Sequence, residues 1–367
     1  MKDPQPHVRH RPAIQLWLYA VATLMVLTLL VGGATRLTES GLSIVEWKPI
    51  TGVMPPLTPE SWQEEFAKYQ RIPQYHALNR GMSLDRFKTI YWWEWSHRML
   101  ARLVGAAFLL PFLVFLWNGW IEPRLRNRLW ALFGAGAVLG AVGWWMVSSG
   151  LSERVSVSQY RLAFHLTLAC AIFAAILWTA SGLKPRATAV APLRLRATAT
   201  GLTILVLLQI YLGALVAGLD AGMIFNTWPW IDGAFIPASE RLWFHSPLWR
   251  NFFENTLTAQ FTHRMAAYGL WLIAVLHFVD VMGAKTGTAA FNRALALACA
   301  MTLQAGIGIA TVLYQAPLAL ALLHQAGAIV VLAVAVVHAE RLSRPRLAAA
   351  PSSQPMAAAR SMPGGTP

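Results

Sequence analysis

Four of the ten histidines in this 367-residue chain occupy matching positions in its two halves. His97 and His263 each open the triplet His-Arg-Met, and His165 and His324 follow them further along the chain. An imidazole can ligate a transition metal or transfer a proton near neutral pH. A role as a helix cap or headgroup contact explains one such histidine, but not four at equivalent positions. The pattern therefore predicts two similar sites with metal or proton chemistry, one in each half.

An acidic residue, Glu94, lies three positions before His97. Residues at i and i+3 share a helix face, so we expect its carboxyl group at the same cavity as the imidazole. The matching position in the second half is Gln260, a neutral amide. This difference favours a reactive first site and a redox or structural second site. An interfacial ion pair between Glu94 and Arg98 or Arg102 is the alternative.

The elements that must position these residues are membrane-spanning helices. Hydrophobic residues make up 56% of the chain and charged residues only 13%, with a mean hydropathy of +0.47. A soluble domain usually carries about 25% charged residues, and a helix needs roughly 20 apolar residues to cross a bilayer. The sequence thus predicts an all-α integral membrane protein with eight transmembrane helices, and it excludes soluble, disordered and disulfide-rich secreted proteins. The qualifying segments are 14–34, 98–117, 129–147, 161–180, 198–217, 262–282, 293–313 and 318–339.

The net charge of +14 indicates how these helices are oriented and does not indicate a nucleic-acid partner. The basic residues lie between long apolar stretches that no soluble nucleic-acid-binding fold requires. Many fall in the N-terminal arm, in alternate connections and after the last span, which the positive-inside rule assigns to the cytoplasm. We therefore expect both termini in the cytoplasm, with an arm at 1–13, a first span that is retained, and a disordered tail at 343–367.

The chain contains an internal repeat. Each half is expected to be a four-helix unit, at 14–180 and 198–340, with a long outer loop after its first helix, at 35–96 and 218–260. Because four spans separate the copies, both units have the same orientation in the membrane. The repeated positions, 181 residues apart, are Gly41, Trp47, Ile50 and Gly52, matched by Gly222, Trp228, Ile231 and Gly233.

The repeat narrows the chemistry of the histidines. In an up-down four-helix bundle the second and fourth helices are diagonal, so their inner faces look at each other across the core. A flat heme fits between two such faces, with one imidazole on each side of its iron. The sequence therefore predicts two heme sites, formed by His97 with His165 and by His263 with His324.

Two further histidines support an alternative. His277 and His338 lie 14 residues after the two second-half histidines, which returns them to within about 40° of the same helix face. Cytochrome b helices use this spacing to hold two stacked hemes, so a two-heme electron-transfer subunit is a second hypothesis. It leaves the first half unexplained, where Pro111 and Thr179 occupy the corresponding positions. A location at the membrane interface, without a functional role, is the simpler interpretation for both histidines.

A transporter built on a parallel repeat is a third hypothesis. It does not explain the histidines near the outer ends of the helices.

Several runs of sequence resemble the heme A synthase family. The resemblance covers nearly all of 14–340 and is closest to the alphaproteobacterial and mitochondrial branch. The Gram-positive branch has a cysteine pair in its first outer loop, whereas Cys170 and Cys299 lie here inside predicted spans. The runs are Gly32–Ser43, Trp47–Pro49, Tyr91–Arg98, Gly143–Val147, Asn226–Pro229 and Phe261–Met265.

The resemblance implies an enzyme that converts heme O to heme A for cytochrome oxidase. Such an enzyme oxidises one ring methyl group to a formyl group by successive hydroxylations. By resemblance, His263 and His324 ligate a heme b cofactor, and His97 and His165 face the iron of the substrate heme. Glu94 matches an essential acidic residue of the family, which could stabilise positive charge or accept protons.

The resemblance also implies a setting and partners. The chain is expected in the cell inner membrane as a multi-pass protein that acts on heme O, with heme O synthase as a membrane partner. Water is thought to supply the formyl oxygen, so an electron acceptor is required, and the sequence does not identify it. The resemblance leaves room for a homo-oligomer.

Overall fold

The computed structural model describes residues 6–184, 191–284 and 286–343. This part of the chain is helical and holds no strand beyond one isolated bridge between Ile231 and Ala234. Eight of its helices are long and apolar enough to cross a membrane, which confirms the predicted number of spans. They are α1 (Pro6–Leu37), α4 (Leu84–Trp117), α5 (Pro123–Ser148), α6 (Gln159–Gly182), α7 (Leu193–Gly218), α11 (Thr256–Gly283), α12 (Thr288–Leu313) and α13 (Leu318–Leu342).

These helices extend beyond the predicted spans, because their ends continue into residues that are too polar to be counted as part of an apolar span. Helix α1 begins at Pro6, so the described part of the predicted arm at 1–13 is the first part of a helix. Helix α4 begins at Leu84, where the Ser83 side chain accepts a hydrogen bond from the Arg86 amide. Its first turns occupy the end of the predicted loop 35–96, since a cap sets where a helix starts more firmly than apolarity does. Apart from Ser343, the predicted tail at 343–367 lies outside the described residues.

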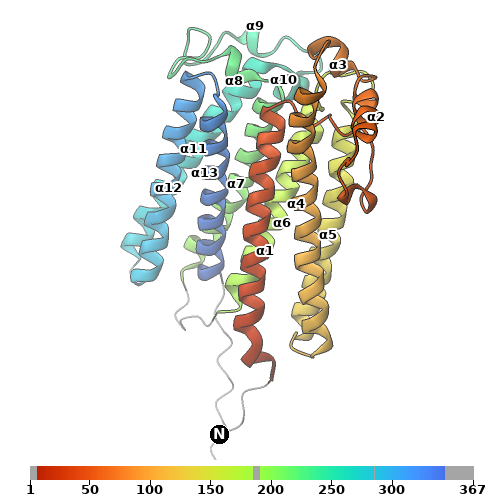
Figure 1. The fold of residues 1–367 in the computed structure, drawn as a ribbon. Helices are drawn as coiled ribbons and strands as arrows, with labels where there is room; N and C mark the ends of the chain where they lie inside the picture. The colour runs from red at the N-terminus through yellow and green to blue at the C-terminus, as the bar shows by residue number, and fades with distance from the viewer. Residues whose placement is uncertain (1–5, 185–190, 285, 344–367) are drawn as a thin grey trace, which may run out of the picture.

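The long helices form two groups of four with the same pattern of contacts (Figure 1). In the first group α4 and α6 each pack against α1 and α5. In the second group α11 and α13 each pack against α7 and α12. The second and fourth helices of each group are therefore diagonal, as the bundle argument predicts. The shared pattern is consistent with the internal repeat.

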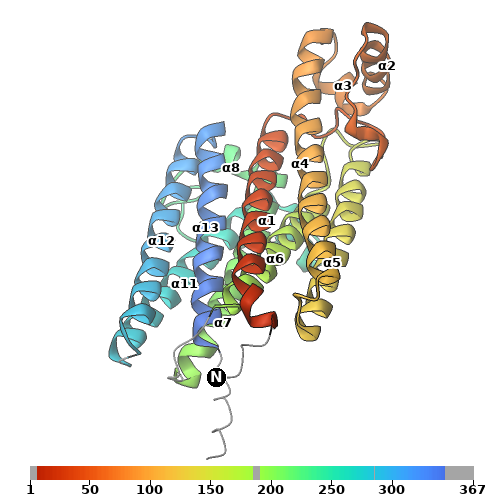
Figure 2. The ribbon, with the colours of Figure 1, turned by 60° about the horizontal axis from the view of Figure 1, so that its bottom comes forward.

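The two groups meet along α1 and α6 on one side and α7 and α13 on the other, and Figure 2 shows α1 lying beside α13. A continuous core of buried apolar side chains, including Leu18 and Leu332, fills this interface. The Gln325 amide of α13 donates a 2.7 Å hydrogen bond to the Leu29 carbonyl of α1 and occupies the space above Gly33. Outward-facing residues such as Leu110 are well exposed, as suits a surface in contact with lipid.

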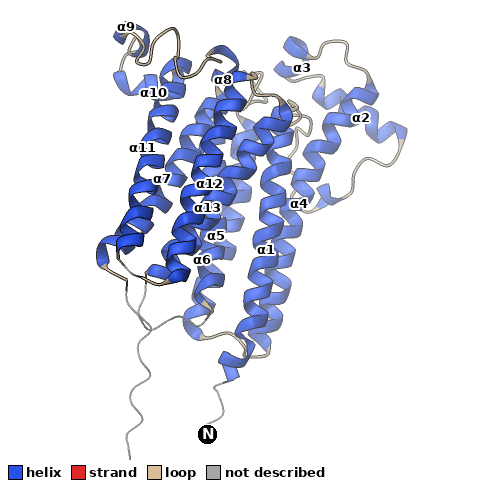
Figure 3. Ribbon diagram, turned by 90° about the vertical axis from the view of Figure 1, so that its left-hand side faces the viewer, coloured by secondary structure: helices blue, strands red, loops and turns tan. Residues whose placement is uncertain are grey.

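Both long connections lie at the same end of the bundle, here called the loop face, and the N-terminal end of α1 lies at the opposite end (Figure 3). The first connection is the larger, and its apolar side chains, among them Leu42, Ile44 and Tyr69, are buried against Phe87 and Tyr91 of α4. This packing fixes the loop relative to α4, the helix that carries Glu94 and His97. The short helices of the two connections are η1 (Thr51–Val53), α2 (Pro59–Tyr69), α3 (Pro73–Leu78), α8 (Ala221–Ile224), α9 (Ser239–Leu242), η2 (Leu248–Arg250) and α10 (Asn251–Glu254).

Candidate functional site

The four matched histidines lie on the two diagonal helices of each group, towards the loop face. His97 is on α4 and His165 on α6, while His263 is on α11 and His324 on α13. Each imidazole is partly exposed rather than buried. Helices α4 and α6 both pack against α1 and α5, and α11 and α13 both pack against α7 and α12. The structure thus places each predicted pair on facing helices of a single group.

Each of these imidazoles packs against a glycine on a neighbouring helix. The positions are Gly32 under His97, Gly143 under His165, Gly213 under His263, and Gly308 under His324. A Cβ atom added at these glycines would lie 2.6, 3.0, 3.0 and 2.8 Å, respectively, from Cε1 of the imidazole. Only a residue without a side chain lets the helices approach this closely with an imidazole between them.

These four glycines were not singled out by the sequence analysis, although a signal for them was present. Gly32 and Gly213 are 181 residues apart, the spacing of the repeat already visible in the first loops. Extending the repeat backwards into the first helix of each half would have paired them. The steric reason for these glycines becomes visible only when the histidines of the diagonal helices are placed beside them, because a Cβ atom would collide with the imidazole.

The hydrogen bonds at the imidazole Nδ1 atoms differ between the halves. In the second half, side-chain amides reach them: Gln209 Nε2 lies 3.0 Å from His263 Nδ1, and Gln304 Nε2 lies 3.0 Å from His324 Nδ1. In the first half, His97 Nδ1 lies 3.1 Å from the backbone carbonyl of Thr28. His165 Nδ1 is buried without a hydrogen-bond partner.

The donor set fits a heme iron with two axial histidines. Within the described residues, the Nε2 atoms of His97, His165 and His324 have no hydrogen-bond partner, and Nε2 is the usual imidazole atom for iron. His263 Nε2 has only a long contact of 3.4 Å with the Gln209 amide. The residues are therefore free to ligate from facing helices, which is where a helical bundle holds a heme.

Glu94 is buried, with 2% of its surface exposed, and both of its carboxylate oxygens are hydrogen-bonded. Oε1 accepts bonds of 3.1 and 2.6 Å from Nε and Nη2 of Arg98. Oε2 accepts bonds of 2.7 Å from the Ser43 hydroxyl and 2.8 Å from the Ile44 amide. Arg98 was the partner considered in the alternative role, but the Glu94 carboxylate is buried, Arg98 is partly buried, and the pair anchors the first loop to α4. Arg102 instead bonds to loop carbonyls.

Charged groups of the first loop continue this network. Arg98 donates to the backbone carbonyls of Ile44 at 2.7 Å and Glu46 at 2.9 Å. The Glu46 side chain in turn pairs with Lys48 and Lys68, and the hydrogen bonds from these two lysines lower the pKa of Glu46. Residues 43–46 are thus held over the loop-face end of α4 by several charge-assisted bonds.

The second half repeats part of this arrangement without the ion pair. Arg264, which follows its histidine as Arg98 follows His97, donates a 3.0 Å hydrogen bond to the Phe225 carbonyl. Gln260, at the position of Glu94, donates to the same carbonyl at 2.9 Å, and its Oε1 is buried without a partner. The two halves share an arginine that holds the loop and differ in the charge beside it.

His277 and His338 do not form a second heme site in this structure. Their Nε2 atoms are hydrogen-bonded directly to each other at 2.8 Å, and the residues are 2% and 0% exposed. A heme iron between them would need both Nε2 atoms for itself. Both residues lie near the ends of α11 and α13 opposite the loop face and are buried between the helices of the second group.

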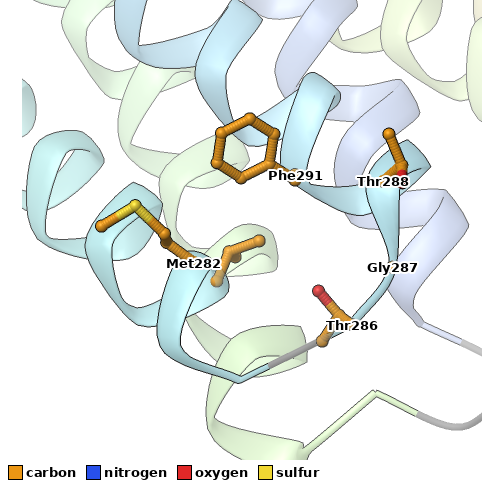
Figure 4. Close-up of a pocket in the computed structure, with 6 residues that line it drawn as sticks. Met282, Thr286, Gly287, Thr288 and Phe291 are labelled. Atoms are coloured by element: carbon orange, nitrogen blue, oxygen red, sulfur yellow. The ribbon is translucent and has the colours of Figure 1, made fainter.

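One cavity lies far from the paired histidines, and a second lies beside the second pair. A cavity of about 350 Å³ at the end opposite the loop face is lined by α11 and α12, with Met282 and Phe291 on its walls (Figure 4). None of the predicted site residues lines it, so it is not the candidate site. A cavity of about 200 Å³ lies between α7 and α11, and Gln209 is on its wall.

Fold and site together define a class of protein: a multi-pass membrane protein with a pair of facing histidines in each of two four-helix groups. The chain belongs to the cytochrome oxidase assembly protein family, whose model matches residues 15–336. This match covers both groups of helices and all five predicted site residues.

The chain is also similar to curated proteins over nearly its whole length. It is 58% identical over 346 residues to a heme A synthase of Rhodopseudomonas palustris strain BisA53, covering 94% of this chain and 95% of that protein. It is 58% identical over 352 residues to a heme A synthase of Bradyrhizobium diazoefficiens, covering 96% of this chain and 97% of that protein. The resemblance expected from the sequence is confirmed.

Proposed function

We propose that the chain oxidises a ring methyl group of heme O to a formyl group and so produces heme A. The observation that carries this proposal is the pair of facing histidines in each half, in a chain 58% identical to proteins named heme A synthase. Family membership and the direct bond between His277 and His338 both speak against the two-heme cytochrome b alternative.

The two pairs are assigned different hemes. His263 and His324 hold heme b, which supplies an electron-transfer centre when bound. His97 and His165 hold the iron of the substrate heme O, because the buried Glu94–Arg98 pair lies on this side only. The negative charge of Glu94, three residues from His97, favours positive charge developing on the substrate ring.

Oxidation of the methyl group also requires acceptors for electrons and protons. If water supplies the formyl oxygen, conversion of a methyl to a formyl group releases four electrons and four protons. The protons need acceptors at the loop face, and the electrons need an acceptor outside this chain. Heme O synthase is a partner suited to deliver the substrate within the membrane.

The activity is tested in membranes that contain heme O but no heme A. Expression of the chain should produce heme A, identified by mass spectrometry of extracted hemes, and the purified protein should contain heme b together with some heme O or heme A. Two hemes b and no heme A would support the cytochrome b alternative instead. A protein without heme would support a transporter.

The orientation in the inner membrane is part of the same proposal. The loop face lies outside and both termini lie in the cytoplasm, because basic residues gather at the opposite end. Reporter fusions at Arg126 and Arg194 should report a cytoplasmic location, and fusions at Gln63 and Ser239 an external one. One reversed result among these four would contradict the eight-span arrangement.

The glycines under the histidines give a prediction with matched controls. Gly308→Ala places a Cβ 2.8 Å from the imidazole of His324, so the ring must move and heme b content should fall several-fold. Gly306→Ala on the same helix meets no atom within 4 Å and should leave heme b unchanged. Heme b per protein, measured by pyridine hemochrome, distinguishes the two. Equal heme content in both variants would contradict a ligand role for His324.

A further inference from the structure

The second half carries a motif that the first half lacks. Helices α7 and α12 each place a glutamine four residues before the glycine under a histidine: Gln209 before Gly213, and Gln304 before Gly308. One helical turn separates the two positions, so glycine and glutamine contact the same imidazole. Each amide nitrogen is also hydrogen-bonded to the backbone carbonyl of its histidine, at 2.9 Å for Gln209 and 2.8 Å for Gln304.

The corresponding residues of the first half are Thr28 and Leu139. The Thr28 side chain bonds to the Leu24 carbonyl of its own helix, and only the Thr28 backbone reaches His97. Leu139 has no polar group, and His165 Nδ1 is left buried without a partner. No side chain among the described residues holds either imidazole of the first half at Nδ1.

This difference matters for iron ligation. A histidine that binds iron through Nε2 must carry its proton on Nδ1, and such a proton is normally donated to a fixed acceptor that orients the ring. A glutamine amide can serve a bare Nδ1 with its nitrogen and a protonated Nδ1 with its oxygen. The Oε1 atoms of Gln209 and Gln304 are buried without partners, and a turn of each amide exchanges the bond from Nε2 to the histidine carbonyl for a bond from Nδ1 to Oε1.

We infer that Gln209 and Gln304 are positioning residues that make the second half a permanent heme site, and that their absence at Thr28 and Leu139 makes the first half the site of exchange. This inference rests on the proposed function. A cofactor must stay bound through many turnovers, whereas a substrate heme must enter and its product must leave. Two ligands oriented by side-chain amides favour retention, whereas in the first half His165 has no partner at Nδ1, and one unanchored ligand favours exchange.

The test measures how fast heme b leaves the purified full-length protein when excess apomyoglobin is present as a scavenger. Gln209→Leu and Gln304→Leu, which copy the residue found at 139, should each speed the loss of heme b by about 10- to 100-fold. Gln15→Leu is the matched control, because Gln15 is also partly buried in a spanning helix and donates a 2.7 Å hydrogen bond to the Ala180 carbonyl. Its loss rate should equal that of the wild type.

The midpoint potential of heme b separates a positioning role from general loosening of the fold. Loss of the acceptor at Nδ1 makes the imidazole a poorer electron donor, so the Leu variants should have a raised potential. Gln304→Glu keeps an acceptor oxygen and adds negative charge, so it should retain heme b and lower the potential. A role limited to helix packing would not move the potential in opposite directions.

The reciprocal variant places the motif in the first half. Leu139→Gln should provide an acceptor for His165 Nδ1, and more heme O and heme A should then copurify with the protein. The off-rate of the substrate heme should fall by about tenfold. Heme b content is the internal control and should stay constant.

The outcomes distinguish this inference from the function on which it rests. If wild type holds heme b and loses it on His324→Ala, but both Leu variants release heme b at the wild-type rate, the inference is wrong and the proposed function stands. If wild type binds no heme b, or His324→Ala retains it, the assignment of the second half fails and the inference fails with it. Faster release together with shifted potentials supports both.

Discussion

Replacement of His263 or His324 by alanine is expected to abolish stable binding of heme b. In the proposed function each residue holds heme b from one of two diagonal helices, and the other histidine on each of these helices is not free to replace it. His277 and His338 are buried and bonded to each other at 2.8 Å. The spectrum of the purified variants should therefore lack the bis-histidine bands, although the eight-helix fold persists because the core between α1, α6, α7 and α13 is untouched.

The first-half pair should behave differently. His97→Ala and His165→Ala are expected to keep heme b and to stop formation of heme A, since these residues lie in the other group of helices. Heme extraction with mass spectrometry, together with the hemochrome measurement, reads both properties from one sample. If either first-half variant were correctly folded and yet lost all of its heme b, the assignment of one heme to each half would be wrong.

The positions of the helices and the histidines could be predicted from the sequence for physical reasons. A lipid bilayer demands long apolar segments, so all eight spans were visible in composition alone. His97 and His263 were visible because a repeat places the same triplet in both halves. The diagonal placement of the second and fourth helices follows from the up-down arrangement of four consecutive spans in one bundle.

Other features could not be predicted from the sequence, because they depend on contacts between residues far apart in the chain. The helix that carries Glu94 extends 14 residues before the predicted span at 98, because its cap at Ser83 and its packing against the first loop are not apolar signals. Gln209 and Gln304 look like isolated polar residues in apolar helices until the histidines are placed beside them. The two-heme hypothesis placed His277 opposite His338, but their direct hydrogen bond was not predicted, because helical spacing gives the face of a helix and not the distance to its neighbour.

The role of Glu94 was also only half visible in the sequence. Its i+4 neighbour Arg98 was recognised as a partner, but an exposed pair of this kind is worth at most about 1 kcal/mol. The structure buries the carboxylate under Ser43 and Ile44, residues about 50 positions away in the sequence. Burial raises the expected cost of losing the Glu94 charge, because removing one member of a buried ion pair costs about 3–5 kcal/mol.

Replacement of Glu94 by glutamine is therefore expected to have a large effect by two routes. The amide can accept hydrogen bonds on one side only, so its NH₂ group must face either the Arg98 guanidinium or the Ser43 and Ile44 donors. The substitution also removes the negative charge that lies one helical turn before His97. We expect a variant with normal heme b spectra that accumulates heme O or a singly hydroxylated heme, with heme A formation lowered by about 10²- to 10³-fold.

Two controls separate these routes. Ser43→Ala removes one loop contact and keeps the charge, so a small effect of this variant beside a large effect of Glu94→Gln assigns the loss to the charge. Equal losses in both variants would make Glu94 a residue that only holds the loop.

Gln260→Glu is the second control. It places a carboxylate four residues before Arg264, as Glu94 lies before Arg98, and should create no new activity because heme b is not the substrate. Heme A formation by Glu94→Gln within about threefold of the wild type would exclude Glu94 from the reaction, since electrostatic or acid–base assistance is worth far more than that.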